Sequence, residues 1–241
     1  MPLLREMSLA DSIVCPSTWQ KQQFPIEFRS KITVIFDGVD QKLFTEATSD
    51  SRVNSLSLKG TSGDEVVVKP DELILTYATR GMEPLRGFPE FMRAAAYAMQ
   101  HIEHLKVIVA GEDRQAYSYP PSSQMTSWKN FMLNELQDQL DLSRLFFPGL
   151  LSYVQLARLF HRSNLHCYFT RPYVVSWSFY QAVASKSALL INRFPGLDDV
   201  IQNPSSIYSI DINDQSMINS SVHRYLSSPD VAFKDLPMSL I

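Results

Sequence analysis

Apolar runs of about five to nine residues alternate along this sequence with segments in which apolar residues recur at helical spacing. The runs at 72–80 (ELILTYATR) and 105–111 (LKVIVAG) are apolar almost throughout, which is typical of strands buried on both faces of a parallel sheet. Strands that alternate with helices predict such a sheet with helices on both faces. The predicted fold class is therefore α/β, with a doubly wound, Rossmann-like parallel sheet from about residue 70 onward. The pattern predicts strands at 11–16, 31–40, 72–80, 105–111, 144–149, 165–170, 188–192 and 206–211, and helices at 17–24, 89–102, 127–140, 152–163, 178–185, 198–203 and 214–228.

The segment in front of the predicted sheet has a different composition. Residues 45–63 are polar and rich in Ser and Thr, which indicates a loop or linker, with a strand at its leucines as an alternative. We therefore divide the chain into residues 1–44, a linker at 45–69, and a domain at 70–241.

Composition and charge exclude several classes of function. The chain has 241 residues, of which 45% are hydrophobic and 20% charged, and its net charge of −3 gives no basic footprint for nucleic acid. Cys15 and Cys167 lie in strand-like apolar runs, so we expect buried free thiols and a reducing compartment. The sequence contains no run of about 18 apolar residues, so it predicts no transmembrane helix. The first residues contain Glu6 and no long apolar centre, so we expect no secretory signal and a cytoplasmic location.

Candidate ligand-binding residues follow from the predicted sheet, because ligands bind beyond the carboxyl ends of such strands at the switch point in strand order. The segment TRGMEPLRGF, residues 79–88, begins at the end of the predicted strand 72–80 and carries Arg80, Arg86 and Gly87. Two guanidinium groups on a Gly-rich loop suit an anionic group such as a phosphate. Two solvated arginines are the alternative.

The loop after residues 105–111 holds a second group of candidates. Gly111 permits a close approach of the backbone to a ligand. Glu112, Asp113 and Arg114 follow it, either to contact a ligand or to solvate a long loop.

Other catalytic chemistries find no support in the sequence. No group of His, Cys or carboxylate residues has metal-ligand spacing, so we expect neither a metal nor another cofactor. Ser176 and Ser178 flank Trp177, but no histidine lies near them in the sequence, which argues against a serine triad. The residues alone therefore predict an anion-binding α/β domain.

Several motifs in order resemble a known family. ADSIVCPSTWQKQQFP, KITVIFDGVD, YATRGMEPLRGFPEFMRA and YFTRPYVVSWSFYQAVA are similar to segments of the retaining glycosyltransferases of family four, group 1. These enzymes have the GT-B architecture of two Rossmann-like domains. The resemblance covers nearly the whole chain and is to the C-terminal, donor-binding half.

The resemblance implies a role for each part of the chain. Residues 1–44 correspond to the end of the acceptor domain and the hinge segment, and residues 70–241 to the donor domain, so the acceptor half lies outside this chain. The implied ligand is a nucleotide-diphosphate sugar, used as donor substrate without a metal. Residues 1–24 then contain a strand that lacks its original sheet and therefore has unpaired edges. This strand pairs with another copy of the chain, docks on a separate acceptor-domain chain or packs back on the donor domain. The implied site has Arg80, Arg86 and Gly87 at the diphosphate and Tyr173, Ser176, Ser178 and Gln181 at the sugar or ribose.

One departure from the family bears on activity. The family carries two glutamates eight residues apart, and the matching positions here are Tyr173 and Gln181. A glutamine still hydrogen-bonds a hydroxyl group, but it cannot stabilise positive charge developing at an anomeric carbon. No catalytic residue is therefore assigned. Either the chain is the donor half of a glycosyltransferase of the hexosyltransferase type, peripheral at a membrane through a partner, or it is a degenerate, inactive donor domain that binds a nucleotide or a protein.

Overall fold

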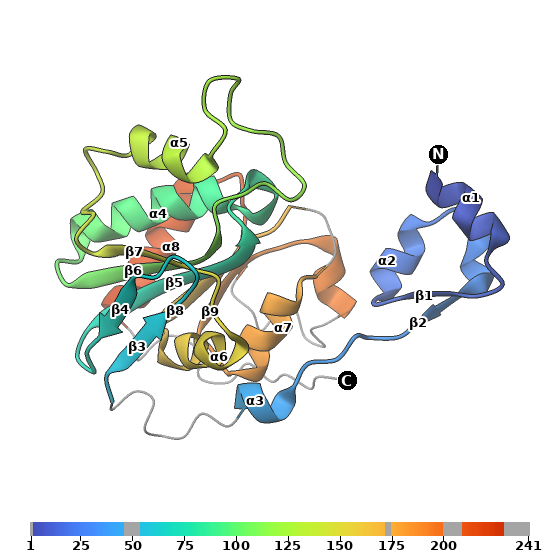
Figure 1. Cartoon of the computed structure of the whole chain (residues 1–241), viewed down its shortest axis with the longest axis horizontal. Coiled ribbons are helices and arrows are strands. Elements are labelled where there is room, and N and C mark those ends of the chain that lie inside the picture. The colour runs from blue at the N-terminus through green and yellow to red at the C-terminus, as the bar shows by residue number, and fades with distance from the viewer. Residues whose placement is uncertain (1, 46–53, 172–174, 200–208, 229–241) are drawn as a thin grey trace.

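The computed structural model describes residues 2–45, 54–171, 175–199 and 209–228. Its centre is a six-stranded sheet with the order β10-β9-β8-β5-β6-β7, in which neighbouring strands run parallel (Figure 1). The chain runs outward from β5 to β6 and β7 and then returns to β8 on the other side of β5, so the switch point lies between β5 and β8. The predicted doubly wound α/β fold is confirmed. The strands are β5 (Leu73–Gly81), β6 (Leu105–Glu112), β7 (Leu145–Gly149), β8 (Leu165–Tyr168), β9 (Leu189–Asn192) and β10 (Ser209–Ile210).

Helices cover both faces of this sheet, because alternate side chains of each central strand are apolar. In β5, Leu75 and Tyr77 belong to one buried cluster, and Ile74 and Ala78 belong to the other. The first cluster packs under α4 (Phe88–His101), α5 (Trp128–Glu135) and α8 (Gln215–Ser227). The second packs under α3 (Gln41–Thr45), α6 (Tyr153–Arg162) and α7 (Trp177–Ala184). Short 3₁₀ helices lie at η3 (Pro84–Arg86) and η4 (Pro195–Asp199).

The predicted linker contains regular structure where it is described. β3 (Leu56–Lys59) provides the strand suggested at the leucines, and it pairs with β4 (Glu65–Val68), which the sequence analysis did not predict. Side chains alternate between buried and exposed along both strands, and the buried ones join the core beside α6. This hairpin is therefore packed onto the domain that contains the six-stranded sheet. The proposed boundaries between domains stay a prediction.

The N-terminal elements form a small unit at one end of the molecule (Figure 1). Strands β1 and β2 pair in parallel, and Met7, Cys15 and Ile32 form the core beneath them. The strand predicted at 31–40 ends at residue 34, because β1 ends at Cys15 and Pro16 has no backbone N–H to continue the ladder. The unit consists of α1 (Pro2–Leu9), β1 (Ile13–Cys15), α2 (Thr18–Gln23), η1 (Ile26–Lys31) and β2 (Ile32–Val34).

This unit contacts the large sheet domain through α2 and η4. The backbone N–H of Trp19 donates to the Asp199 carboxylate at 2.5 Å, and the Trp19 ring lies beside Gly196. Cys15 and Cys167 are both buried and unpaired thiols, as predicted. Among the described residues, none of the helices is long and apolar enough to cross a membrane.

Candidate functional site

A hollow of about 340 Å³ opens at the switch point, where β5 and β8 end. This is the position at which doubly wound sheets bind ligands. Its walls come from the ends of both strands, from the loop after β6, from the start of α7, and from the N-terminal segment. The lining residues are Pro16, Asp37, Tyr77, Ala78, Thr79, Arg80, Arg86, Tyr117, Cys167, Tyr168, Phe169, Val175, Ser176, Trp177 and Ser178.

Arg80 and Arg86 both line this hollow, so the structure brings together the two predicted anion-binding residues. The hydroxyl of Tyr77 donates to the backbone oxygen of Arg86 at 2.7 Å and so fixes the backbone that carries the guanidinium. Burial raises the pKa of Tyr77, which keeps this donor protonated. The Arg86 guanidinium carbon lies 5.7 Å from the centre of the Tyr117 ring, within the range of a cation–π contact. Asp37 is the acidic residue among those lining the hollow.

Gly87 does not line the hollow but joins η3 to α4 beside Arg86. Its φ of +65° is in the left-handed region, and a Cβ atom there would lie 2.3 Å from Cβ of Phe169. A glycine is therefore needed both for the turn and for the close packing of α4 on the end of β8.

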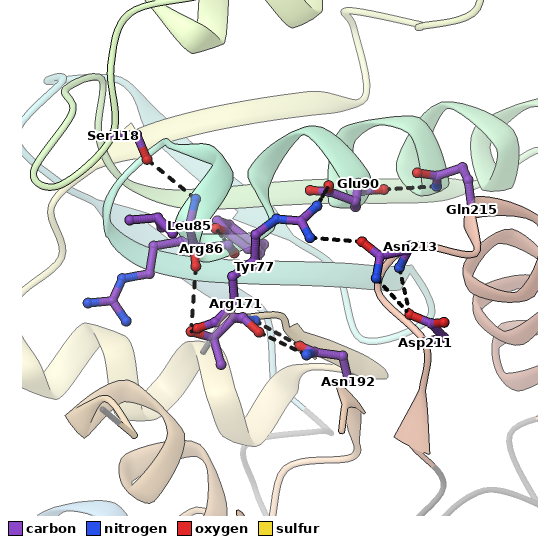
Figure 2. Close-up of polar contacts among 11 residues, drawn as sticks. Tyr77, Leu85, Arg86, Glu90, Ser118, Arg171, Asn192, Asp211, Asn213 and Gln215 are labelled. Atoms are coloured by element: carbon purple, nitrogen blue, oxygen red, sulfur yellow. Dashed lines mark hydrogen bonds and ion pairs between the residues drawn. The ribbon is translucent and has the colours of Figure 1, made fainter. Parts of the chain in front are cut away.

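Side chains at the end of β9 fix the segment that follows β8. The amide of Asn192 accepts from the backbone N–H of Thr170 and donates to its carbonyl oxygen, both at 2.8 Å. Arg171 then donates to Glu90 at 2.5 Å and to Asn213 at 2.9 Å. Figure 2 shows the Arg171 guanidinium between these two side chains, while Arg86 points away from them. Arg171 therefore joins α4 to the segment before α8, whereas the Arg86 side chain lines the hollow.

Helix α7 begins at the hollow with Ser176, Trp177 and Ser178. The Ser176 and Ser178 hydroxyls lie 2.7 Å apart, and the backbone N–H of Ser176 donates to the Tyr168 hydroxyl at 3.2 Å. The first N–H groups of a helix favour an anion. The start of α7 therefore adds to the positive potential that Arg80 and Arg86 supply.

A second hollow of about 310 Å³ adjoins the first, and Asp37 and Trp177 line both. Gln181 lines this second hollow and not the one with the arginines. The Trp177 indole N–H donates to Asp37 at 2.9 Å, which links the wall between the hollows to the N-terminal segment. The other lining residues are Gly38, Val39, Asp40, Leu43, Phe44 and Tyr153.

Comparisons with known proteins bear on the fold. Residues 1–44 match the family profile described as Glycosyl transferase family 4 group. Sucrose-phosphate synthase from Thermosynechococcus elongatus superposes with a TM-score of 0.64 over 95% of this chain and 53% of that protein, at 16% identity. The fold is that of the GT-B glycosyltransferases of group 1.

Two further solved structures share this fold. HepE from Anabaena, solved with UDP and glucose, has a TM-score of 0.62 and 13% identity, and the match covers 92% of this chain. The chain spans 55% of the length of HepE. The C-terminal domain of the group 1 glycosyl transferase LpcC from Francisella tularensis matches 80% of this chain and 90% of its own length, with a TM-score of 0.59 and 14% identity. A search among curated proteins found no match in sequence.

The candidates Gly111, Glu112, Asp113 and Arg114, at the end of β6 and just beyond it, lie outside the hollow. Gly111, with a φ of +137°, lets β5 and β6 approach, since a Cβ atom would lie 2.1 Å from the Thr79 carbonyl oxygen. Glu112 pairs with Arg114 at 2.5 Å, and Asp113 accepts from the Ser127 hydroxyl at 2.7 Å. All four shape the strand end and its loop. Tyr173 lies outside the described residues.

Residues that the sequence analysis did not select also line the hollow. The sequence analysis selected neither Tyr117, in the loop beyond the predicted strand 105–111, nor Asp37, within the predicted strand 31–40. Trp177 could have been noticed as a large aromatic residue at the start of a helix, where it is 58% exposed. Burial raises the pKa of the Cys167 thiol, which therefore stays neutral in the hollow wall. No group of three or more His, Cys, Asp or Glu side chains that could hold a metal occurs in the described ranges.

Proposed function

We propose that this chain binds a nucleotide-diphosphate sugar, with the diphosphate in the hollow between β5 and β8, as the donor half of a retaining glycosyltransferase. The observation that carries the proposal is the convergence of Arg80, Arg86 and the start of α7 on one hollow at the switch point. Paired guanidinium hydrogen bonds and helix N–H groups are the contacts that phosphate oxygens favour. HepE, which shares the fold, was solved with UDP and with UDP-glucose.

The charges of the two hollows support an orientation of the bound donor, with its diphosphate in the first hollow and its sugar or ribose toward the second. The first hollow has two arginines and one aspartate among its described lining residues, whereas the second has Asp37 and Asp40 and no described cation. An anionic diphosphate therefore favours the first, and an uncharged, hydroxyl-rich group favours the second. Gln181 in the second hollow offers an amide to such hydroxyls. We assign Gln181 to the sugar or ribose on this basis. We propose the same role for the hydroxyls of Ser176 and Ser178, which line the first hollow on either side of Trp177.

Transfer requires an acceptor, and we propose that a polypeptide outside this sequence binds it. The chain spans about half the length of HepE and of sucrose-phosphate synthase. Val14 and Val34 of the two-stranded N-terminal sheet are 61% and 38% exposed, although parallel strands are normally covered on both faces. A separate acceptor-domain chain or a second copy of this chain would cover them. The buried thiols of Cys15 and Cys167 fit a cytoplasmic location.

A binding module without transfer activity is the second candidate. The neutral Gln181 favours it, because the side chain has no charge with which to stabilise a developing cation. This module would bind either a nucleotide or a protein. Nucleotide binding is therefore the first property to measure, because the enzyme requires it and a purely protein-binding module does not.

Titration calorimetry of the chain with UDP, GDP and ADP tests the proposal. We expect one nucleotide to bind and the Arg80→Ala, Arg86→Ala double variant to weaken it at least about a hundredfold, because a hydrogen bond to a charged group contributes about 1.5–3 kcal/mol. Arg5 and Arg158 are exposed and outside the hollow, so their double alanine variant is the matched control and should bind normally. Absence of binding by the unmodified chain at millimolar nucleotide would refute the proposal. Nucleotide binding alone does not distinguish the enzyme from the binding module. Release of sugar from the donor by the unmodified chain would favour the enzyme.

A further inference from the structure

Glu83 is a buried carboxylate directly in front of η3, and its contacts lead to the arginine hollow. Its side chain is fully excluded from solvent. One carboxylate oxygen accepts from three consecutive backbone N–H groups, those of Ala116 at 3.0 Å, Tyr117 at 2.9 Å and Ser118 at 2.8 Å. Charged acceptors make stronger hydrogen bonds than neutral ones, so this carboxylate is the principal anchor of that stretch of backbone.

The anchored stretch belongs to the long loop between β6 and α5, residues 113–127. Figure 1 shows this loop projecting at the top of the molecule, away from the sheet. Tyr119 near its tip is 88% exposed, so the loop gains little from burial of its own side chains. A second contact joins it to η3, because the Leu85 backbone N–H donates to the Ser118 hydroxyl at 3.4 Å (Figure 2). The contacts that join the loop to Glu83 and η3 are therefore made by residues 116–118, while the Trp128 indole N–H donates to the Tyr119 carbonyl oxygen at 2.9 Å.

The same stretch carries Tyr117, whose ring lies beside the Arg86 guanidinium and lines the hollow. Glu83 also accepts the Arg86 backbone N–H through its own carbonyl oxygen at 3.0 Å. One residue thus fixes both the backbone of Arg86 and the aromatic ring against which its side chain rests.

We infer that Glu83 is a positioning residue for the diphosphate site: it holds residues 116–118 so that Tyr117 directs Arg86 into the hollow. It touches no ligand, and it acts through Tyr117 and Arg86. The inference rests on the proposed binding of a nucleoside diphosphate in that hollow. It predicts that the loop and the affinity of the site respond together to Glu83.

The first measurement needs no ligand. Hydrogen exchange of the Glu83→Ala chain should be at least about tenfold faster than in the unmodified chain at amides 116–118, while the amides of β5 and β6 keep their protection. Glu83→Gln keeps an oxygen acceptor in place and should restore most of the protection, which also guards against a misfolded alanine variant. Equal exchange at 116–118 in all three proteins would overturn the inference.

The second measurement is a double-variant cycle with UDP or inorganic pyrophosphate as the probe. Glu83→Ala and Tyr117→Ala should each weaken binding about tenfold, and Glu83→Ala should add less than about twofold once Arg86 is already alanine. Glu135→Ala removes a carboxylate that joins α5 to α4 through Arg93 and serves as the control that leaves affinity unchanged. A full effect of Glu83→Ala in the Arg86→Ala chain would overturn the inference. If the unmodified chain binds neither probe, the proposed function fails, while hydrogen exchange still decides whether Glu83 holds the loop.

Discussion

Replacing Gly87 by alanine should destabilise the protein by more than its backbone conformation alone explains. Alanine in the left-handed region costs about 1 kcal/mol relative to glycine, because its Cβ atom approaches the following carbonyl oxygen. At Gly87 the new Cβ atom would also lie 2.3 Å from Cβ of Phe169 and 3.3 Å from Cδ1 of Ile212. The Phe169 atom is the fixed end of its side chain, so the clash is relieved only by moving α4 or the end of β8. Such overpacking costs about 1–3 kcal/mol, which gives a total of about 2–4 kcal/mol.

Gly63 provides the matched control for this prediction. It lies in the turn of the β3–β4 hairpin with a φ of +86°, and nothing lies within 4 Å of a Cβ atom built there. Gly63→Ala should therefore cost only the backbone term of about 1 kcal/mol. Urea unfolding followed by circular dichroism measures both losses as shifts of the midpoint at constant slope. Equal losses for the two variants would refute the packing argument. A loss of UDP affinity in Gly87→Ala alone would in addition show that this turn positions Arg86.

Three further changes test the surroundings of the site. Asn192→Ala removes both hydrogen bonds to the Thr170 backbone. It should lower the free energy of unfolding by about 2–4 kcal/mol, because buried backbone groups lose their partners. A loss under about 1 kcal/mol in urea unfolding would contradict this role. Arg171→Lys should weaken the contact with Glu90 and Asn213, since an ammonium group cannot span two acceptors as a guanidinium does, and faster hydrogen exchange at residues 170–171 would report it. Burial lowers the pKa of His166 from 6.5 to about 3, so the unfolded chain binds a proton that the folded chain does not. The free energy of unfolding should therefore fall by about 2 kcal/mol from pH 7 to pH 5, and a His166→Gln chain with the same pH dependence would disprove that origin.

The central part of the fold could be predicted because its pattern is unambiguous. β5 and β6 are apolar on both faces, and the structure shows that each face meets its own layer of helices. The β3–β4 hairpin was mostly overlooked because its strands are four residues long and lie in a Ser- and Thr-rich segment. In β3, which reads LSLK, apolar and polar residues nevertheless alternate in the sequence. In β4, which reads EVVV, they do not, because Val67 is exposed.

The sequence could predict only those site residues that lie at or near the ends of strands. Arg80 and Arg86 meet at one hollow because Arg80 lies at the end of β5 and Arg86 follows it closely. Gln181 is separated from the two arginines because of the direction in which α7 points its side chain, and Trp177 lies between the two hollows. The role of Glu83 depends on a contact with residues more than thirty positions further along the chain, which periodicity does not report.

A crystal structure of the chain with the nucleotide that titration selects tests the central claim most directly. The account predicts the diphosphate between the guanidinium groups of Arg80 and Arg86 and the first N–H groups of α7, with the ribose or sugar extending toward Gln181. A nucleotide bound elsewhere, or a diphosphate that contacts neither arginine, would contradict it.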